Sequence, residues 1–402
     1  MEQFYIINTE GLARARVCSN LTRVLGVDHF FDVYQLSQKA KGEVFDSDTF
    51  YNSCKAELNN LLPLTNRIKF DYQRILFDFE KQTDKWKNEI GEEESEVLRF
   101  LFAVFRKDID PYVQFIVFLK IFLNIDDHLI VNLFKLNKES IDTVIYQFSN
   151  GLKKRKYPFT IPMAKSLNDR LKFMISQLNF LFQFIGEAKG ITKEKKVEVL
   201  TGVIGVYEII REEERCNIPL VHSVLAYSLF EFAQNQSRFD KDGSVCHFPF
   251  QDRSLWNKEI MDWGWSYLAG ISEVEGEITN YRLESLMLGL LMNTPSFREV
   301  KWKEVHKVSK FLKEFSTSIN TDLIHAFTTG LIFGPQEGID EILDIEGLND
   351  LKDYILLPYF LGELYYIKGD KETANSFFEE CFSLSKSWKE KKFITKNILK
   401  SV

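Results

Sequence analysis

Apolar residues recur three and four positions apart along most of the chain, the spacing that gives a helix one apolar face. Beyond residue 162 this pattern is nearly continuous, and it is clearest in the segments 165–186, 195–214 and 220–237. Glycine and proline, at 20 and 9 of 402 residues, rarely interrupt it. The pattern predicts an all-α protein whose C-terminal half is an α-helical array.

Two breaks in the pattern divide the chain. Residues 84–96 are acidic and poor in apolar side chains, so we interpret them as a linker. The second break follows residue 156, where Pro158 and Pro162 stop a helix. We therefore predict three domains, over residues 1–90, 91–160 and 161–402. Within the third, residues 239–257 carry Asp-Gly turn chemistry and a central proline, which predict an irregular segment.

Residues 125–152 contain two short helical patterns with a break at Leu136–Asn137, and Asp126 is placed to cap the first. Their apolar positions are Ile130, Val131 and Phe134, then Ile141, Val144, Ile145 and Phe148. Such a pair is either an ordinary helical hairpin or a helix-turn-helix, which places its second helix in the major groove of DNA. The basic run 153–156 that follows favours the second interpretation, because cations there would neutralise phosphates.

Charge sets the middle of the chain apart. Residues 97–160 hold ten Lys and Arg against six Asp and Glu, whereas the whole chain carries a net charge of −7. That balance argues against a surface that is basic throughout. The longest apolar stretch, 115–123, contains Lys120 and is too short to cross a membrane. Five cysteines without a CxxC pair and an N-terminus without a signal pattern predict a cytoplasmic protein with no membrane segment.

The stretch from Leu98 through these helices to Pro162 resembles the promoter-reading second domain of extracytoplasmic-function sigma factors. Residues 225–260 resemble the helical C-terminal extension of a long subgroup of that family. The matching residues are Leu225, Ala226, Arg238, Asp240, Gly243, Gln251, Asp252, Arg253, Ser254 and Trp256. The resemblance continues through 281–285 and 333–343, and it covers residues 97–400 better than 1–90.

The resemblance implies two small sigma-type helical domains before the array, and an RNA polymerase sigma factor that directs transcription initiation. Its partners would be core RNA polymerase and promoter DNA, with no cofactor and no enzymatic activity. The candidate DNA-contacting residues are Lys138, Ser140, Thr143 and Gln147 on the second helix and Lys153, Lys154, Arg155 and Lys156 after it. Lys138, Ser140 and Gln147 are expected to contact base edges. The four consecutive cations are expected to contact the DNA backbone.

The positions that carry Arg and Lys in relatives are occupied here by Thr143, Val144, Gln147, Ser149 and Gly151. Weaker and less specific DNA binding is therefore expected. One alternative is a sigma-derived adaptor whose promoter choice comes from a further protein or a nucleic-acid-guided partner. Others are a helical scaffold without a transcriptional role, or a helical hydrolase whose groups converge only in space. In the N-terminal domain, Phe50 and Tyr51 either stack on unpaired bases or belong to a core.

Two motifs in the array predict packing. Six residues match the 34-residue tetratricopeptide pattern, namely Leu361, Gly362, Tyr365, Ala374, Phe378 and Cys381. Gly362 and Ala374 predict the close approach of two antiparallel helices. In the irregular segment, Asp252 and Arg253 would tie the chain to neighbouring helices and Trp256 would anchor it, or the three would form a ligand site.

Other motifs give weak signals for chemistry. Residues 201–205 lack the lysine of a phosphate-binding loop, and Cys246–His247 has no second Cys/His pair at zinc spacing. We expect neither a phosphate-binding loop nor a metal site from them. His222 and His325 lie within apolar helical patterns, so we expect them to be packed rather than catalytic.

Overall fold

The computed structural model describes residues 34, 90–136, 139–155, 160–163, 165–271, 279–315 and 318–398. Over these residues the secondary structure is helical and contains no strand, apart from a single isolated bridge between Phe239 and Val245. The all-α prediction is confirmed. The chain forms two compact units, the first of residues 1–188 with 198–217 and the second of 189–197 with 218–402.

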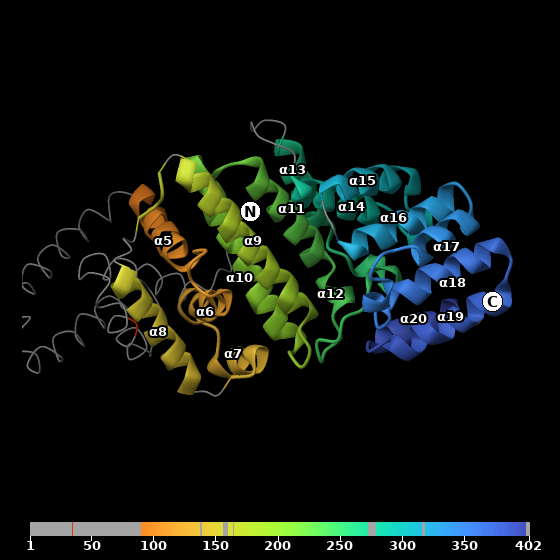
Figure 1. Ribbon diagram of the computed structural model, residues 1–402, viewed down its shortest axis with the longest axis horizontal. Helices are drawn as coiled ribbons and strands as arrows, with labels where there is room; N and C mark the ends of the chain where they lie inside the picture. The colour runs from red at the N-terminus through yellow and green to blue at the C-terminus, as the bar shows by residue number, and fades with distance from the viewer. Residues whose placement is uncertain are drawn as a thin grey trace, which may run out of the picture. The chain divides into compact units, whose positions relative to one another are not determined.

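The first unit contains five of the helices labelled in Figure 1 and most of a sixth. They are α5 (Ile90–Val104), α6 (Pro111–Val117), α7 (Asp127–Phe134), α8 (Glu139–Arg155), α9 (Lys165–Glu187) and residues 198–212 of α10 (Lys193–Glu212). A π-helical turn, η3 (Phe118–Phe122), continues α6, and a 3₁₀ turn, η4 (Glu214–Cys216), follows α10.

The linker predicted over residues 84–96 is wrong for its second half, because residues 90–96 form the first turns of α5. Glutamate is a good helix former, and negative charge near a helix N-terminus is favourable. The scarcity of apolar residues therefore marked the start of a helix rather than a linker.

Aromatic side chains fill the core of the first unit. The Phe118 ring centroid lies 5.5 Å from that of Phe105 and 5.2 Å from that of Phe122, and all three side chains are buried. Lys120, which interrupts the apolar stretch, is also buried, and its Nζ lies 2.5 Å from Asp127 Oδ1. The pairing with this carboxylate explains how a lysine is accommodated inside an apolar helix.

The first unit extends past the predicted boundary near residue 160. Helix α9 packs against α5, where the Arg170 guanidinium donates a hydrogen bond to the carbonyl of Phe102 and lies 5.6 Å from the centre of its ring. The prolines after α8 end a helix without ending the compact unit, because the apolar face of α9 is buried against α5.

The second unit is a series of helices, most of them packed on the next along the chain. They are α11 (Pro219–Ala233), α12 (Asn235–Arg238), α13 (Lys258–Gly270), α14 (Asn280–Met292), α15 (Trp302–Phe315), α16 (Ile319–Ile332), α17 (Pro335–Leu343), α18 (Leu356–Lys368), α19 (Lys371–Leu384) and α20 (Trp388–Asn397). The 3₁₀ turns are η5 (Phe248–Phe250), η6 (Arg253–Leu255), η8 (Phe297–Glu299) and η9 (Leu348–Leu351). From α13 to α20 every helix contacts its successor, which is the packing of a repeat-like array.

The tetratricopeptide match corresponds to α18 and α19, which lie side by side in Figure 1. Gly369 ends α18 with a left-handed φ of 92°, and the Asp370 side chain caps α19 by accepting from the Thr373 amide. A Cβ atom at Gly362 would lie 2.6 Å from Cε1 of Phe378. The predicted close approach of the two helices is confirmed, since the Phe378 ring fills the space above this glycine.

The irregular segment after α12 is anchored by two of the three residues predicted for that role. The Trp256 indole donates to Ser237 Oγ and to Gln251 Oε1, both at 2.9 Å. Nη1 of Arg253 donates to carbonyl oxygens near the end of α14, those of Leu291 and Thr294, both at 2.9 Å. Asp252 is exposed and accepts from the amide of Ser254, a contact within its own turn.

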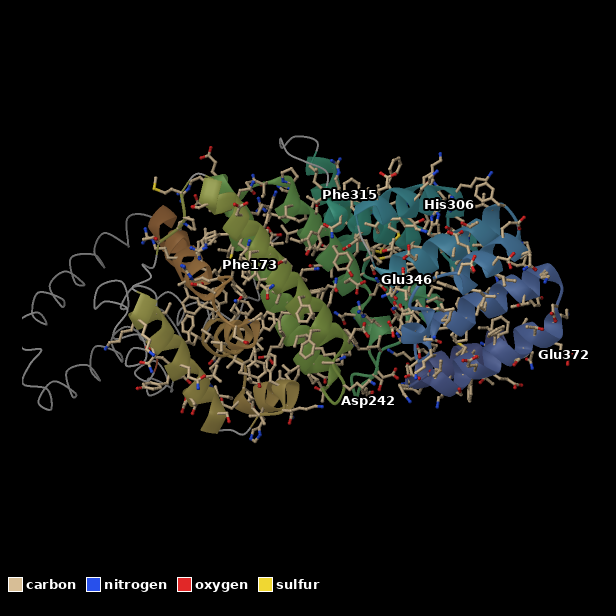
Figure 2. All side chains as sticks on the ribbon, viewed as in Figure 1. Phe173, Asp242, His306, Phe315, Glu346 and Glu372 are labelled. Atoms are coloured by element: carbon tan, nitrogen blue, oxygen red, sulfur yellow. The ribbon has the colours of Figure 1, made fainter. Side chains whose placement is uncertain are left out.

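Two histidines form a stacked pair between α15 and α16. The rings of His306, marked in Figure 2, and His325 have centroids 4.5 Å apart and planes 18° apart. Nδ1 of His306 lies 3.0 Å from Thr328 Oγ1, and Nδ1 of His325 lies 3.0 Å from Ser309 Oγ. His325 is therefore part of the packing between helices, as the sequence predicts.

This pair should make the second unit acid-sensitive. Burial lowers the pKa of His306 and of His325 below 6.5, and the effect exceeds the opposing influence of Glu341 on both rings. The unfolded chain therefore takes up these protons at a higher pH than the folded chain. Consequently the free energy of unfolding should fall as the pH drops below about 6.5.

Urea unfolding followed by circular dichroism at about pH 7.5 and about pH 5.5 measures this effect. His306→Phe keeps a ring against His325 but removes one titrating group, so the loss of stability on acidification should be smaller than in the unaltered protein. The control is His128→Phe, at an exposed position of α7. An unchanged pH dependence in His306→Phe would contradict the prediction.

Candidate nucleic-acid interface

Helices α7 and α8 form the predicted pair of short helices with an intervening turn. Asp126 caps α7, its Oδ1 accepting from the amide of His128 at 2.8 Å, as the sequence predicts. The chain leaves α7 at Lys135, whose left-handed φ of 53° redirects the backbone, and α8 begins at Glu139. Of the break predicted at Leu136–Asn137, Leu136 lies between the two helices and Asn137 lies outside the described residues.

One face of α8 is held in the first unit, where the helix packs on α6. The buried apolar side chains of that face are Ile141, Val144, Ile145, Phe148 and Leu152. Ser149 is also buried. Val144 and Ser149, two of the positions at which the resemblance predicts cations, therefore face the protein interior. Side chains at these two positions do not reach the surface of the described part of the first unit.

The opposite face of α8 is polar and exposed. Thr143 and Gln147 lie one helical turn apart on this face, and Lys153 and Lys154 are exposed at its C-terminal end. Tyr146 lies among them with 51% of its surface exposed. Tyr146 was not among the predicted contact residues, although its position three residues after Thr143 places the two side chains on neighbouring positions of the helix surface.

Four further residues were predicted to contact DNA, namely Lys138, Ser140, Arg155 and Lys156. Ser140 is half-buried in the first turn of α8. Lys138, Lys156 and the side chain of Arg155 lie outside the described residues, so their predicted phosphate and base contacts stay predictions. Phe50 and Tyr51, the candidates for stacking on unpaired bases, lie outside them as well.

An acidic group borders the exposed face. Asp142 is exposed beside Thr143, and its Oδ1 accepts a hydrogen bond of 2.9 Å from the hydroxyl of Tyr34. The Tyr34 side chain is buried, so this carboxylate is held by a residue far away in the sequence. A negative charge here would oppose a phosphate at the N-terminal end of the face, whereas the lysines at the other end would attract one.

The arrangement offers hydrogen-bonding groups rather than catalytic ones. A hydroxyl, an amide and two ammonium groups lie along one helix face, and these groups suit base edges and phosphates. Among the residues that the structure describes, no three His, Cys, Asp or Glu side chains gather as metal ligands. Over the same residues, no helix combines the length and apolarity that crossing a lipid bilayer requires.

Comparison of the chain with protein-family models, with curated proteins and with solved structures finds no match in any of the three. The interpretation of α8 therefore rests on the sequence motifs and on the geometry of this helix.

Proposed function

We propose that the protein is an RNA polymerase sigma factor of the extracytoplasmic-function type, which acts in the cytoplasm and binds core RNA polymerase and promoter DNA. The observation that carries the proposal is the two-sided character of α8. Its apolar side is buried, and its exposed side presents Thr143 and Gln147 and ends at Lys153 and Lys154. A short turn joins α8 to α7, as in helix-turn-helix proteins that insert the second helix into the major groove.

Each exposed group has a role that follows from its chemistry. The amide of Gln147 can pair with an adenine edge, and the hydroxyl of Thr143 can donate to or accept from a base. Lys153 and Lys154 neutralise phosphates and position the helix without reading sequence. With so few cations on the face, affinity should be modest and should depend on contributions from the rest of the polymerase complex.

A second candidate is a sigma-derived adaptor that binds polymerase and takes its promoter choice from a partner. The neutral Thr143 and Gln147 on the exposed face of α8 favour it, since cations there in relatives supply DNA affinity. Polymerase pull-down followed by transcription from genomic fragments separates the candidates. Transcripts without added factors support the sigma factor, bound polymerase without transcripts supports the adaptor, and no bound polymerase excludes both.

Removing the two lysines tests the role of α8 directly. Lys153→Ala/Lys154→Ala should weaken binding to duplex DNA about tenfold, because two phosphate contacts are lost. The slope of log K against log salt should become shallower by about 2. Fluorescence anisotropy with labelled duplex across a salt series measures both quantities.

Two further variants sharpen this test. Lys303→Ala/Lys307→Ala removes the same charge from exposed positions on α15 and should leave binding within about twofold of the unaltered chain. Gly151→Arg should tighten binding, because a side chain there enters open space on α8 and adds a cation. Equal losses in the two double variants would contradict a specific role for α8.

A further inference from the structure

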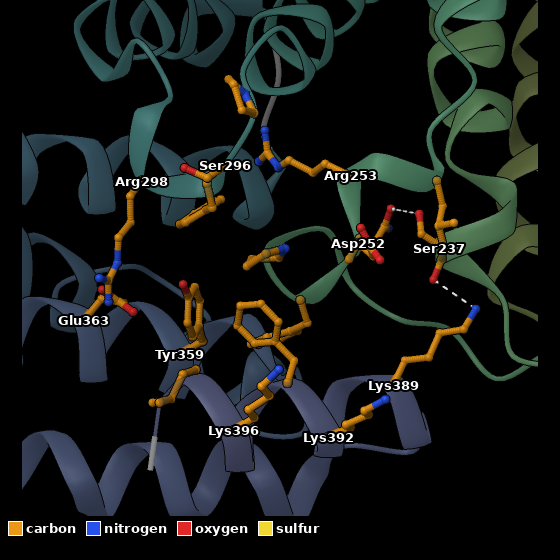
Figure 3. Close-up of a pocket in the computed structure, with 18 of the residues that line it drawn as sticks. Ser237, Asp252, Arg253, Ser296, Arg298, Tyr359, Glu363, Lys389, Lys392 and Lys396 are labelled. Atoms are coloured by element: carbon orange, nitrogen blue, oxygen red, sulfur yellow. Dashed lines mark hydrogen bonds between the residues drawn. The ribbon is translucent and has the colours of Figure 1, made fainter. Parts of the chain in front are cut away.

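The second unit contains a cavity of about 750 Å³, shown in Figure 3. Its walls come from five places in the chain, namely Ser237 of α12, the segment 249–255, the segment 295–298, helix α18 and helix α20 with the adjoining Ile398. The volume is in the range of small-molecule and cofactor sites, roughly 300–1,000 Å³.

One wall of the cavity is a continuous set of aromatic rings. The Tyr359 ring centroid lies 4.9 Å from that of Phe250 and 5.8 Å from that of Phe297. The Phe250 ring lies 5.9 Å from that of Phe393. All four residues line the cavity. Tyr359 and Phe250 are buried and pack edge to face, whereas Phe297 and Phe393 are partly exposed, so a flat ring entering the cavity can contact these two.

Cations outnumber acids around the cavity. The lining cations are Arg253, Arg298, Lys389, Lys392 and Lys396, and the lining acids are Asp252 and Glu363. Burial raises the pKa of Glu363, which reduces the tendency of that carboxyl to hold a negative charge. The electrostatic balance of the cavity therefore favours an anionic ligand.

The cations differ in the hydrogen bonds that their side chains already make. Lys389 donates to backbone carbonyls, among them that of Phe239 at 2.7 Å. Lys392 and Lys396 are exposed and lie one turn apart on the side of α20 that lines the cavity, where Figure 3 labels both. These two ammonium groups and the exposed guanidinium of Arg298 are accessible positive charges for an incoming anion.

Arg253 adds a cation that is fixed in position. Its guanidinium carbon lies 4.7 Å from the ring centroids of Phe248 and Trp256, and Nη1 is held by backbone carbonyls. Nη2 is buried and has no hydrogen-bond partner. Burial lowers the pKa of Arg253 to about 10, so the group keeps its charge near neutral pH. Arg253 is therefore a fixed positive charge in the wall of the cavity.

We propose that this cavity binds a mononucleotide, with the phosphates held by the exposed Lys392 and Lys396, the base against the partly exposed rings of Phe297 and Phe393, and Arg253 adding a fixed positive charge in the wall. Cations and contiguous rings within one cavity of this size fit a ligand that joins phosphate to a flat ring. An acidic peptide would use the lysines without needing the rings, and free phosphate would leave the rings uncovered. The site lies in the second unit and does not depend on DNA binding by α8.

Isothermal titration calorimetry of the full chain with ATP, GTP, CTP and UTP tests the proposal. At least one of these should bind, and inorganic phosphate and adenosine should each bind at least about tenfold more weakly, because each lacks half of the contacts. Binding should also change the tryptophan fluorescence, and Trp388→Phe should reduce that change, since Trp388 lines the cavity.

Two exposed lysines outside the cavity, one on α19 and one on α20, provide a matched control. Lys392→Ala/Lys396→Ala should weaken nucleotide binding about tenfold or more. Lys391→Ala/Lys371→Ala removes the same charge from exposed positions that do not line the cavity and should stay within about twofold. Lys391 and Lys392 also match in their surroundings, since each ammonium lies over one ring, that of Phe382 at 5.5 Å and that of Trp388 at 5.7 Å.

Four results would overturn the proposal. They are no binding of any of the four nucleotides up to about 1 mM, equal binding of inorganic phosphate, equal weakening in both double variants, and preferential binding of a poly-glutamate peptide. The last would assign the cavity to an acidic protein segment. None of these results depends on whether the chain binds DNA or polymerase.

Discussion

Gly338→Val should lower the free energy of unfolding of the second unit by at least about 3 kcal/mol, at the upper end of overpacking costs. A Cβ atom at this position would lie 2.4 Å from Cα of Gly330 and 2.9 Å from the carbonyl oxygen of Ala326. These are backbone atoms of α16, which cannot rotate away as the end of a side chain can. Helices α16 and α17 would have to separate, and the contacts of the buried Ile339 and Ile342 would be lost with that movement.

Urea unfolding followed by circular dichroism measures this loss, and Gln336→Val is the matched control. Gln336 lies on the same helix at an exposed position, where valine replaces a hydrogen bond to Asp340. That change should cost only a few tenths of a kcal/mol for the pair plus a small loss of helix propensity. If both valine variants had the same unfolding midpoint, the close helix crossing would not be a determinant of stability.

Glu390→Ala should destabilise the second unit by about 3–5 kcal/mol, as removal of one partner from a buried polar network does. The Glu390 side chain is buried at 1% exposure. Its carboxylate accepts a hydrogen bond from the backbone N–H of His247 at 2.6 Å and lies 2.7 Å from Nδ1 of the His247 ring. It also accepts a hydrogen bond from the hydroxyl of Ser385 at 2.7 Å. Alanine would leave these buried groups without their acceptor.

The measurement is again urea unfolding, with two comparison variants. Glu390→Gln keeps the shape and part of the hydrogen bonding, so it should cost less than alanine does. Glu380→Ala removes a carboxylate from an exposed position on α19 and should change stability by less than about 0.5 kcal/mol. A loss in Glu390→Ala no larger than that in Glu380→Ala would show that this network does not hold α20 to residue 247.

Most of the helices could be predicted from the sequence because their information is local. The spacing of apolar residues located α9, α10 and α11, and the cap at Asp126 located the start of α7. The match of Gly362 with Phe378 predicted a helix contact because a small residue opposite a large one is a local requirement of close packing. The acidic first turns of α5 were not predicted as helix, because residues 91–96 contain no apolar side chain whose spacing could reveal a helical period.

The sites were less accessible to sequence reasoning. The exposed residues of α8 could be proposed from the sequence, but the burial of Val144 and Ser149 required the position of α6. Of the cavity, the sequence indicated only Asp252 and Arg253, as members of the alternative ligand site in the irregular segment. The cations of the cavity come from the turns η6 and η8 and from helix α20. No sequence motif connects these three parts of the chain.

The sequence by itself determined that the chain is helical, where most helices begin and end, and which face of each is apolar, because these properties follow from neighbours within one or two turns. Only the tertiary structure decided which faces meet, that α9 belongs with α5, that Glu390 closes on His247, and that Arg253, Lys392 and Lys396 border one cavity. Those outcomes depend on side-chain shape and charge across long sequence separations, where many alternative pairings satisfy the same periodic pattern and packing selects one.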